Sequence, residues 1–189
     1  MPRAGLSREA VVERAARMMD EAGSAPLQLQ ALAESLGVRV PSLYKHVDGM
    51  PGLQRDVTVH GRAEMAHALR QAVGGSADAE AVTRLAHAYR AWAVAHPARY
   101  ALAMRPPAPG DDEDRAAAED LAGVVYAVLA GYGLTGDDAV DATRFLRSAL
   151  HGFVALETGS AFALSADTGR SWDRLVASVV AALEAWPRG

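Results

Sequence analysis

The sequence predicts an all-α fold, in which an N-terminal three-helix head with a helix-turn-helix (residues 1–50) precedes a helical body (residues 51–189). The first observation is that apolar residues recur every three to four positions along most of the chain, as on one face of a helix. The second is that glycine and proline separate these periodic stretches. The third is that strand signals are nearly absent, because isoleucine does not occur and no alternating run of β-branched residues is present.

The head contains three short helical patterns. Ser7 is a suitable N-cap for the first pattern, which Gly23 closes. The second pattern covers residues 29–36, and the third covers residues 38–47. Gly37 separates the two and is expected to form a tight turn between them.

The body contains six further helical patterns, each bounded by turn residues or proline. Pro51 suits the first turn of the helix that follows the Asp48-Gly49 break, and residues 106–114 form the clearest loop in the chain. The expected helices cover residues 53–73, 78 to the His96-Pro97 break, 98–104, 115–132, 136–157 and 170–186.

Composition excludes several kinds of protein. Hydrophobic residues make up 50% of the 189 positions, so the chain can bury a core. The absence of cysteine excludes disulfides, thiolate zinc sites and cysteine nucleophiles. No secretion segment follows the start, and no stretch approaches the roughly 20 apolar residues that cross a bilayer. We therefore expect a soluble, cytoplasmic protein.

The net charge of −4 argues at first against a nucleic-acid partner, but the charges are unevenly distributed. Acidic and basic residues balance within residues 1–50, so the negative charge lies in the body. Residues 36–47 include Arg39, Lys45 and His46 but no acid, and Lys45 is the only lysine of the chain. This segment is the part of the head that favours a polyanion.

Residues 29–47 match the requirements of a helix-turn-helix. Such a motif needs a small residue where its helices touch, a turn residue that tolerates positive φ, and apolar side chains that fix the crossing angle. Ala33 is the small residue and Gly37 is the turn residue. The apolar side chains are those of Leu29, Leu32, Leu36, Val38 and Leu43.

In residues 38–47, the second helix of the motif, the side chains that do not pack against the first helix are expected to face outward. The helix that enters a major groove presents its side chains in this way. Pro41 is tolerated there because the first turn of a helix has no amide partner to lose. An alternative is an ordinary helix end followed by a turn, but a plain surface helix rarely lacks acids altogether. The outward residues are Arg39, Val40, Pro41, Ser42, Tyr44, Lys45 and His46.

The segment Leu-Gly-Val-Arg-Val-Pro-Ser-Leu-Tyr-Lys-His-Val (residues 36–47) resembles the DNA-binding signature of the TetR family of repressors, and the match is specific through residues 6–55. The resemblance implies a homodimeric, ligand-responsive transcriptional regulator. It also implies a repressor that a small hydrophobic or aromatic effector releases from palindromic, double-stranded operator DNA.

Individual roles follow from the same resemblance. It assigns phosphate contacts to Tyr44 and His46, and it brings Gln28 close to a further phosphate. It places at base edges or at the DNA backbone Arg39, Pro41, Ser42 and Lys45.

The head departs from the family pattern at two positions. The family usually has an aromatic residue at the position of Val47 and a lysine at the position of Met50. Loss of that lysine removes one expected phosphate contact, which should weaken DNA binding uniformly and flatten its salt dependence.

The body resembles the ligand-binding and dimerisation domain of the same family. Its last two helices are apolar on more than one side, so a symmetry mate is expected to cover the second face. Gly152 in mid-helix costs about 1 kcal/mol relative to alanine, which a close approach between helices would explain. Residues 146–157 also resemble the Trp-His-Gly subfamily, with Leu150 in place of tryptophan. The expected dimer interface contains Leu150, Gly152, Phe153, Leu175, Val179 and Leu183.

Bulky residues on the middle helices are candidates for an effector pocket. A mostly apolar pocket with a few polar groups would suit a hydrophobic or aromatic effector. The alternative is that these side chains only fill the core. The candidates are Met65, Leu69, Tyr89, Trp92, Tyr100, Met104, Tyr126, Phe145 and His151.

Two other classes of function, an enzyme and a protein–protein adaptor, are alternatives for a helical chain of this kind. Glu64 and His67 have the spacing of a carboxylate-bridged di-iron site, but such a site needs a second Glu-x-x-His, and the sequence has none. The chain also lacks a recognisable nucleophile elbow and a glycine-rich phosphate loop. We therefore expect no catalytic residues, no metal and no cofactor. A helical protein–protein adaptor would use the same apolar faces without binding DNA.

Overall fold

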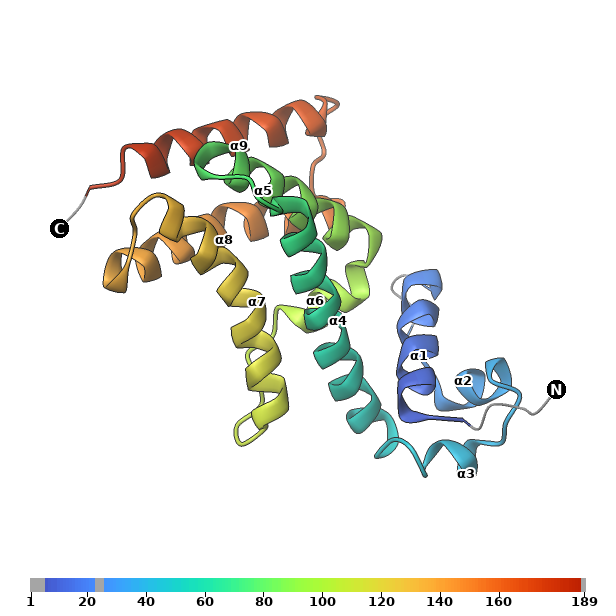
Figure 1. The fold of residues 1–189 in the computed structure, drawn as a ribbon. Helices are drawn as coiled ribbons and strands as arrows, with labels where there is room; N and C mark the ends of the chain where they lie inside the picture. Colours follow the sequence, from blue (N-terminus) through green and yellow to red (C-terminus); the bar gives the residue numbers. More distant parts are fainter. Residues whose placement is uncertain (1–5, 23–25, 188–189) are drawn as a thin grey trace. The chain divides into compact units, whose positions relative to one another are not determined.

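The structure is a computed structural model that describes residues 6–22 and 26–187, and every regular element in these ranges is a helix (Figure 1). The expected all-α fold is confirmed. Gly23, expected to close the first helix, lies outside the described residues. The helices are α1 (Arg8–Ala22), α2 (Leu29–Ser35), α3 (Val40–Leu43), α4 (Gly49–Val73), α5 (Asp78–Ala95), α6 (Pro97–Ala103), α7 (Asp112–Gly131), α8 (Gly136–Thr158) and α9 (Thr168–Glu184).

The chain divides into two compact units. The N-terminal unit contains residues 1–64 and 95–118, and the C-terminal unit contains residues 65–94 and 119–189. The division therefore falls inside α4 and α7 and not at the boundary expected after residue 50. The assignment of DNA binding to residues 1–50, and of ligand binding and dimerisation to residues 51–189, stays a prediction.

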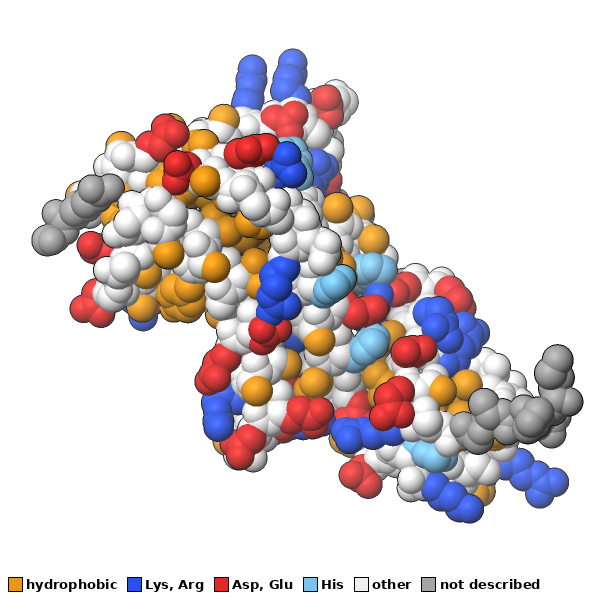
Figure 2. All heavy atoms as spheres, viewed as in Figure 1, with side chains coloured by type: hydrophobic (Ala, Val, Ile, Leu, Met, Phe, Trp, Pro, Cys, Tyr) orange, Lys and Arg blue, Asp and Glu red, His pale blue; other side chains and the backbone are white. Residues whose placement is uncertain are grey.

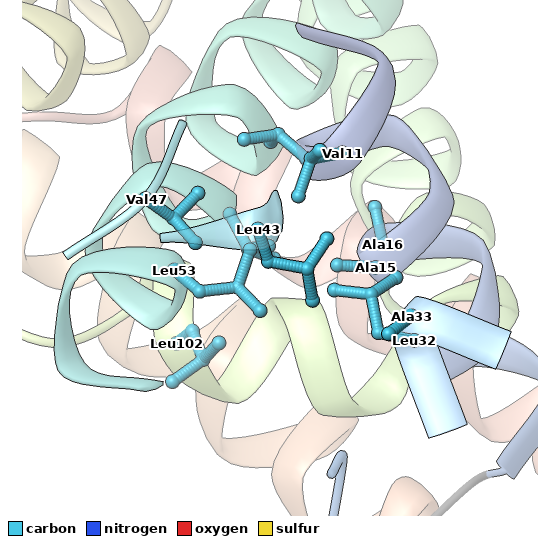
Figure 3. Close-up of a cluster of buried hydrophobic side chains, with 11 residues drawn as sticks. Val11, Ala15, Ala16, Leu32, Ala33, Leu43, Val47, Leu53 and Leu102 are labelled. Atoms are coloured by element: carbon cyan, nitrogen blue, oxygen red, sulfur yellow. The ribbon is translucent and has the colours of Figure 1, made fainter. Parts of the chain in front are cut away.

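The N-terminal unit is built around one apolar cluster, to which α1, α2, α3, α4 and α6 contribute (Figure 3). Leu43 of α3 belongs to this cluster together with Val11 of α1 and Leu53 of α4 (Figure 3). Leu102 of α6 belongs to the same cluster, which explains why α6 falls within this unit although it is distant in sequence.

The C-terminal unit has a largely aliphatic and aromatic core. Trp172 of α9 is fully buried, and its ring lies 5.1 Å from that of Phe153 of α8 and 6.4 Å from that of His87 of α5. The guanidinium of Arg90 lies over both the Phe153 and Trp172 rings and is paired with Glu157. Helices α5, α8 and α9 are thereby joined within this unit.

Helix α7 begins three residues earlier than expected. Residues 112–114, expected to be part of a loop, form its first turn. Asp111 is the reason, because its carboxylate accepts a hydrogen bond from the Asp114 amide at 3.0 Å, as an N-cap residue does. The three acids that follow Asp111 are also favoured by the positive end of the helix dipole.

Taken singly, none of the described helices is long and apolar enough to cross a membrane. Helices α7 and α8 meet that test only when counted together, and they are bent by 112° relative to each other.

Candidate nucleic-acid interface

The turn between α2 and α3 is defined by backbone hydrogen bonds. The Val38 amide donates to the Ala33 carbonyl at 3.0 Å, and the Gly37 amide donates to the Glu34 carbonyl at 3.0 Å. These two bonds form a Schellman motif, which requires its penultimate residue to adopt a left-handed conformation. Gly37 has a φ of +67°, so a residue without a Cβ is needed at the turn that the sequence predicts.

The apolar side chains expected to fix the two helices are packed as predicted. Ala33 is 1% exposed, and Leu32 and Leu43 are fully buried. Leu29, Leu36 and Val38 are partly buried and pack against the same cluster. The helix-turn-helix therefore has a defined crossing of α2 and α3, which is what a rigid recognition element requires.

Helix α3 is shorter than the residue 38–47 segment expected from the sequence. It covers Val40–Leu43, with Arg39 at its N-cap and Pro41 in its first turn. The chain then continues as a turn, in which the His46 and Val47 amides donate to the Leu43 carbonyl at 2.8 and 3.0 Å. The recognition element is therefore one helical turn followed by a hydrogen-bonded turn.

The side chains expected to contact DNA differ in exposure. Tyr44 is 57% exposed although it is a large aromatic residue, and Val40 is half-buried against the apolar cluster. Ser42 and His46 are also half-buried. Figure 2 shows basic and histidine side chains at the α3 end of the face in view. The exposed members of the set are Gln28, Arg39, Pro41, Tyr44 and Lys45.

In the same unit, Arg55 joins α4 to the start of α7. Its guanidinium donates two hydrogen bonds to the Asp111 carboxylate at 2.6 and 2.7 Å, and a third to Glu113 at 2.6 Å. This pairing holds the pKa of Asp111 well below its ordinary value and raises the pKa of Arg55. Asp56, the next residue, pairs with Arg8 at the start of α1.

Arg99 of α6 joins α6 to α1 in the same unit. It donates two hydrogen bonds to the Asp20 carboxylate, at 2.7 and 3.0 Å, and also pairs with Glu64 of α4. His96 lies 2.9 Å from Asp20 through its Nδ1 atom. Planar, two-point contacts of this kind fix orientation as well as distance.

Arg62 of α4 is the most buried charge among the described residues, with 1% of its surface exposed. It pairs with the buried carboxylate of Asp114 and donates to the carbonyls of Ala103 at 3.1 Å and Arg105 at 2.5 Å. Arg62 therefore satisfies carbonyls at the end of α6 that the helix itself leaves unpaired.

Sequence reasoning missed these arginine contacts. Each joins residues far apart in the chain, with a separation of 79 positions for Arg99 and Asp20 and 52 for Arg62 and Asp114. Asp114 belongs to the acidic run taken as a loop. The one available signal was Arg62 itself, a charge in the interior of a long helix.

Glu64 does not pair with His67, the residue whose spacing raised the di-iron alternative. It pairs with Arg99, and its carboxylate lies 3.6 Å from the Nε2 atom of His60; the interactions with His60 first, and then with Arg99, lower the pKa of Glu64 to about 2. His67 is exposed. Across the described ranges, no group of three or more His, Asp or Glu residues could hold a metal ion.

The nine candidate effector residues are not brought together in one place. Tyr100 and Met104 belong to the N-terminal unit, and the other seven belong to the C-terminal unit. Tyr126 and Phe145 are exposed, and the Phe145 ring rests 5.6 Å from that of Trp186. The residues buried within the C-terminal unit are Met65, Leu69, Tyr89 and Trp92, while His151 is half-buried.

The residues expected at a dimer interface are also divided. Leu150, Val179 and Leu183 are each 2% exposed, so they pack inside the single chain and cannot reach a partner. Phe153 and Leu175 are half-buried. Gly152 is exposed, and a Cβ built there would have no atom within 4 Å. Of the six, Gly152 is therefore the most accessible to a second copy.

A helical fold with a packed helix-turn-helix and an acid-free α3 defines a helix-turn-helix DNA-binding transcriptional regulator. The family described as "Tetracyclin repressor-like, C-terminal domain" matches residues 82–179. An uncharacterised HTH-type transcriptional regulator of Mycobacterium tuberculosis is 44% identical over 82% of this chain and 71% of its own length. One of Bacillus subtilis is 32% identical over 85% of this chain and 84% of its own length. The chain belongs to the TetR family.

Solved structures show the same fold. A TetR from Acinetobacter baumannii, in complex with minocycline, has a TM-score of 0.73 at 20% identity and covers 98% of this chain and all of its own. The Streptomyces coelicolor TetR family protein ActR, in complex with (S)-DNPA, has a TM-score of 0.70 at 18% identity, over 97% of this chain and all of its own. At these identities the likeness concerns the fold alone. Membership of the Trp-His-Gly subfamily stays a prediction.

Proposed function

We propose that this protein is a homodimeric repressor that binds a palindromic operator through α3 and is released by a small effector bound in the C-terminal unit. The observation that carries the DNA-binding part is the Gly37 turn, which presents Arg39, Tyr44 and Lys45 outward without an acid among them. A dimer would set two such surfaces about one DNA turn apart.

Phosphate contact by Lys45 and Tyr44 can be tested in a mobility-shift assay on the DNA upstream of the protein's own gene. Lys45→Gln should weaken binding and lower the slope of log affinity against log salt by about 2 per dimer, because each of the two subunits loses one phosphate contact. Tyr44→Ala should weaken binding while the dimer stays intact. Arg17→Gln, a matched loss of an exposed cation on α1, should bind as the unaltered protein does.

A dimer without salt-sensitive binding to any palindromic DNA near its gene would contradict the proposal and favour the protein–protein adaptor. Equal losses for Lys45→Gln and Arg17→Gln would instead contradict the proposed placement of α3 on DNA.

Dimerisation is proposed to use the exposed, small-residue faces of α8 and α9. Ser148, Gly152 and Ala155 follow one another along exposed positions of α8, and Ala177 and Ala181 do so along α9. Small residues allow two helices to approach closely, and four helices from two copies would cover these faces.

Gly152→Arg tests this interface, because space around Gly152 lets a single chain accept the side chain. It should yield folded monomers by sedimentation equilibrium, whereas Ala91→Arg, at an exposed position of α5, should leave the dimer unchanged. An intact Gly152→Arg dimer would refute the interface.

The effector is proposed to be small and hydrophobic or aromatic. Met65, Leu69, Tyr89 and Trp92 are buried within the C-terminal unit and are suited to line a mostly apolar site. Binding to one state of the dimer would change DNA affinity by the coupling free energy between the two sites. Two solved structures of the same fold, in complex with minocycline and with (S)-DNPA, support small-molecule binding by proteins of this fold.

A further inference from the structure

Arg39 occupies the N-cap position of α3 but does not act as a cap. It has the extended backbone of an N-cap residue, with a φ of −91° and a ψ of 149°, and its side chain makes no capping hydrogen bond to the described residues. Serine, threonine, aspartate and asparagine are preferred at this position because their oxygen atoms accept a hydrogen bond from an amide of the first turn, which a guanidinium cannot do. The side chain of Arg39 therefore contributes nothing to the start of α3.

The Arg39 side chain also lacks an acidic partner, unlike most cations of the N-terminal unit. Among the described residues of this unit, only Arg39, Lys45 and Arg105 are cations without an ion pair, and all three are exposed. Arg39 and Lys45 stand at the two ends of α3. A residue that departs from the local preference without a structural gain is expected at a functional site. The arginines of the unit that do form ion pairs are Arg8, Arg14, Arg17, Arg55, Arg62, Arg99 and Arg115.

Among the side chains of α3 and its N-cap, that of Arg39 is the best suited to recognise a base. Val40 is half-buried against the apolar cluster, and Leu43 is fully buried. Pro41 is exposed, but its ring has no donor or acceptor, and Ser42 is half-buried with a single hydroxyl. Arg39 is exposed and has N–H donors arranged in a planar fork. Its side chain can therefore donate two hydrogen bonds to the edge of one base.

The major groove determines which base such a fork fits. A helix-turn-helix contacts base edges with the N-terminal residues of its second helix, and Arg39 lies directly before the first turn of α3. Guanine presents two neighbouring acceptors there, O6 and N7, whereas no other base presents more than one. We propose that Arg39 recognises one guanine in each operator half-site through hydrogen bonds to these two atoms. This role of Arg39 rests on the proposed function, because it requires α3 to lie in the groove.

Selection of DNA by the full chain tests the base preference. A pool of duplexes with a random central segment is incubated with the unaltered protein and with Arg39→Ala, and the bound sequences are determined. The unaltered protein should select half-sites with guanine at one position, where Arg39→Ala should accept any base while its other preferences stay the same. Identical preferences of the two proteins would overturn the proposal.

Arg105→Ala is the matched control in this selection. It removes an exposed arginine of the same unit that, like Arg39, has no ion pair among the described residues. Arg105→Ala should select the same sequences as the unaltered protein. Because both arginines are exposed and unpaired, both variants should melt as the unaltered protein does, which circular dichroism measures. Loss of the guanine preference in both variants would overturn the assignment to Arg39.

A change of one atom in the selected DNA tests the contact itself. 7-Deazaguanine keeps O6 and ordinary base pairing but has a C–H group in place of the N7 acceptor. Placed at the selected guanine of both half-sites, it should weaken binding by the unaltered protein about tenfold in a mobility-shift assay. Arg39→Ala should bind the two DNAs equally. An equal loss for both proteins would mean that another group contacts N7, and it would overturn the proposal.

A contact with phosphate is the other role open to an exposed arginine, and a second DNA distinguishes it. When adenine replaces the selected guanine, Arg39→Ala should bind within about threefold of the unaltered protein, since the base contact is absent from both. Lys45→Gln should weaken binding to the guanine and adenine DNAs by the same factor, as loss of a phosphate contact does. If Arg39→Ala behaves as Lys45→Gln does, Arg39 contacts phosphate and the proposal is overturned.

The same selection separates the role of Arg39 from the proposed function. A protein that selects palindromic DNA without a guanine that depends on Arg39 overturns the role of Arg39 alone. A protein that selects no DNA overturns the proposed function, and the role of Arg39 with it. Selection of palindromic DNA by the unaltered protein, with loss of one guanine in Arg39→Ala, is the result expected when both hold.

Discussion

The two units of the chain are stabilised in different ways. In the N-terminal unit, Arg55, Arg62 and Arg99 each join helices through contacts with carboxylates more than 50 positions away, as for Arg62 and Asp114, which are 52 apart. In the C-terminal unit, edge-to-face contacts of the Phe153 and His87 rings with Trp172 join α5, α8 and α9. The ion pairs described between helices of this unit include Arg90–Glu157, which is half-buried, and Arg70–Asp120, which is exposed.

The two kinds of contact differ in how strictly they fix the orientation of the groups that they join. Two-point contacts between a guanidinium and a carboxylate fix the orientation of both groups, whereas apolar cores accept many combinations of similar volume. A surface that must match the spacing of phosphates gains from the first kind of constraint. On the face shown in Figure 2, charged side chains lie over both units, so the distinction concerns buried contacts and not surface charge.

The largest expected effect is the loss of the buried arginine of the N-terminal unit. Arg62→Met leaves the Asp114 carboxylate buried without its partner and leaves the Ala103 carbonyl without a donor. We expect the free energy of unfolding to fall by about 3–5 kcal/mol, measured by urea denaturation.

Arg70→Met is the matched variant in the C-terminal unit. Its side chain and that of its partner Asp120 are 46% and 52% exposed, so the loss should stay below about 1 kcal/mol. Similar losses for Arg62→Met and Arg70→Met would remove the contrast between the two units.

An intermediate effect should come from one substitution made at two glycines. Gly37→Ala forces a Cβ into a left-handed conformation and should destabilise by about 1–2 kcal/mol, although the space around it is open. Gly123→Ala, inside α7 with no atom within 4 Å of the new Cβ, should stabilise by about 1 kcal/mol. Thermal unfolding of both variants would test this, and a gain at Gly37 would contradict the Schellman turn.

The smallest expected effect is the pH dependence that the pairing of His60 with Glu64 gives to the N-terminal unit. Glu64 raises the pKa of His60 above its ordinary 6.5, so the pair stabilises the fold below that pH and this stability is lost as the pH rises through the raised pKa. The pKa of Glu64 is lowered from 4.5 to about 2, so its contribution is present above pH 4.5 and lost toward pH 2.

His60→Gln should therefore cost less than about 1 kcal/mol near pH 5.5 and nothing near pH 9. Denaturation at the two pH values measures the difference. His67→Gln, at an exposed histidine of the same helix, is the control, and an equal pH dependence in that variant would argue against the pairing of His60 with Glu64.

Local features of the structure were predictable from the sequence, because they depend on neighbouring residues. Gly37 favours the end of α2 because glycine adopts the positive φ of the turn without strain, and Pro97 favours a break because it disfavours helix at His96. The packing of Leu32 and Leu43 followed from helical spacing in the same way.

Features that depend on distant residues were not predictable. Asp114 was taken as part of a loop because its buried partner is contributed by α4. Leu150 and Val179 were assigned to a partner subunit, because periodicity shows that a helix face is apolar but not whether the same chain covers it.

Lys45 has one further consequence, because it is exposed and is the only lysine in the 189 residues. Reagents that acylate amines will find a single side-chain target, and it lies on α3's turn beside Tyr44. Protection of this amine by bound DNA would therefore be a one-residue footprint, readable by mass spectrometry. By the same reasoning, coupling the protein to a sensor chip through the Lys45 amine would cover the surface around Tyr44. The protein should therefore be coupled through a different group.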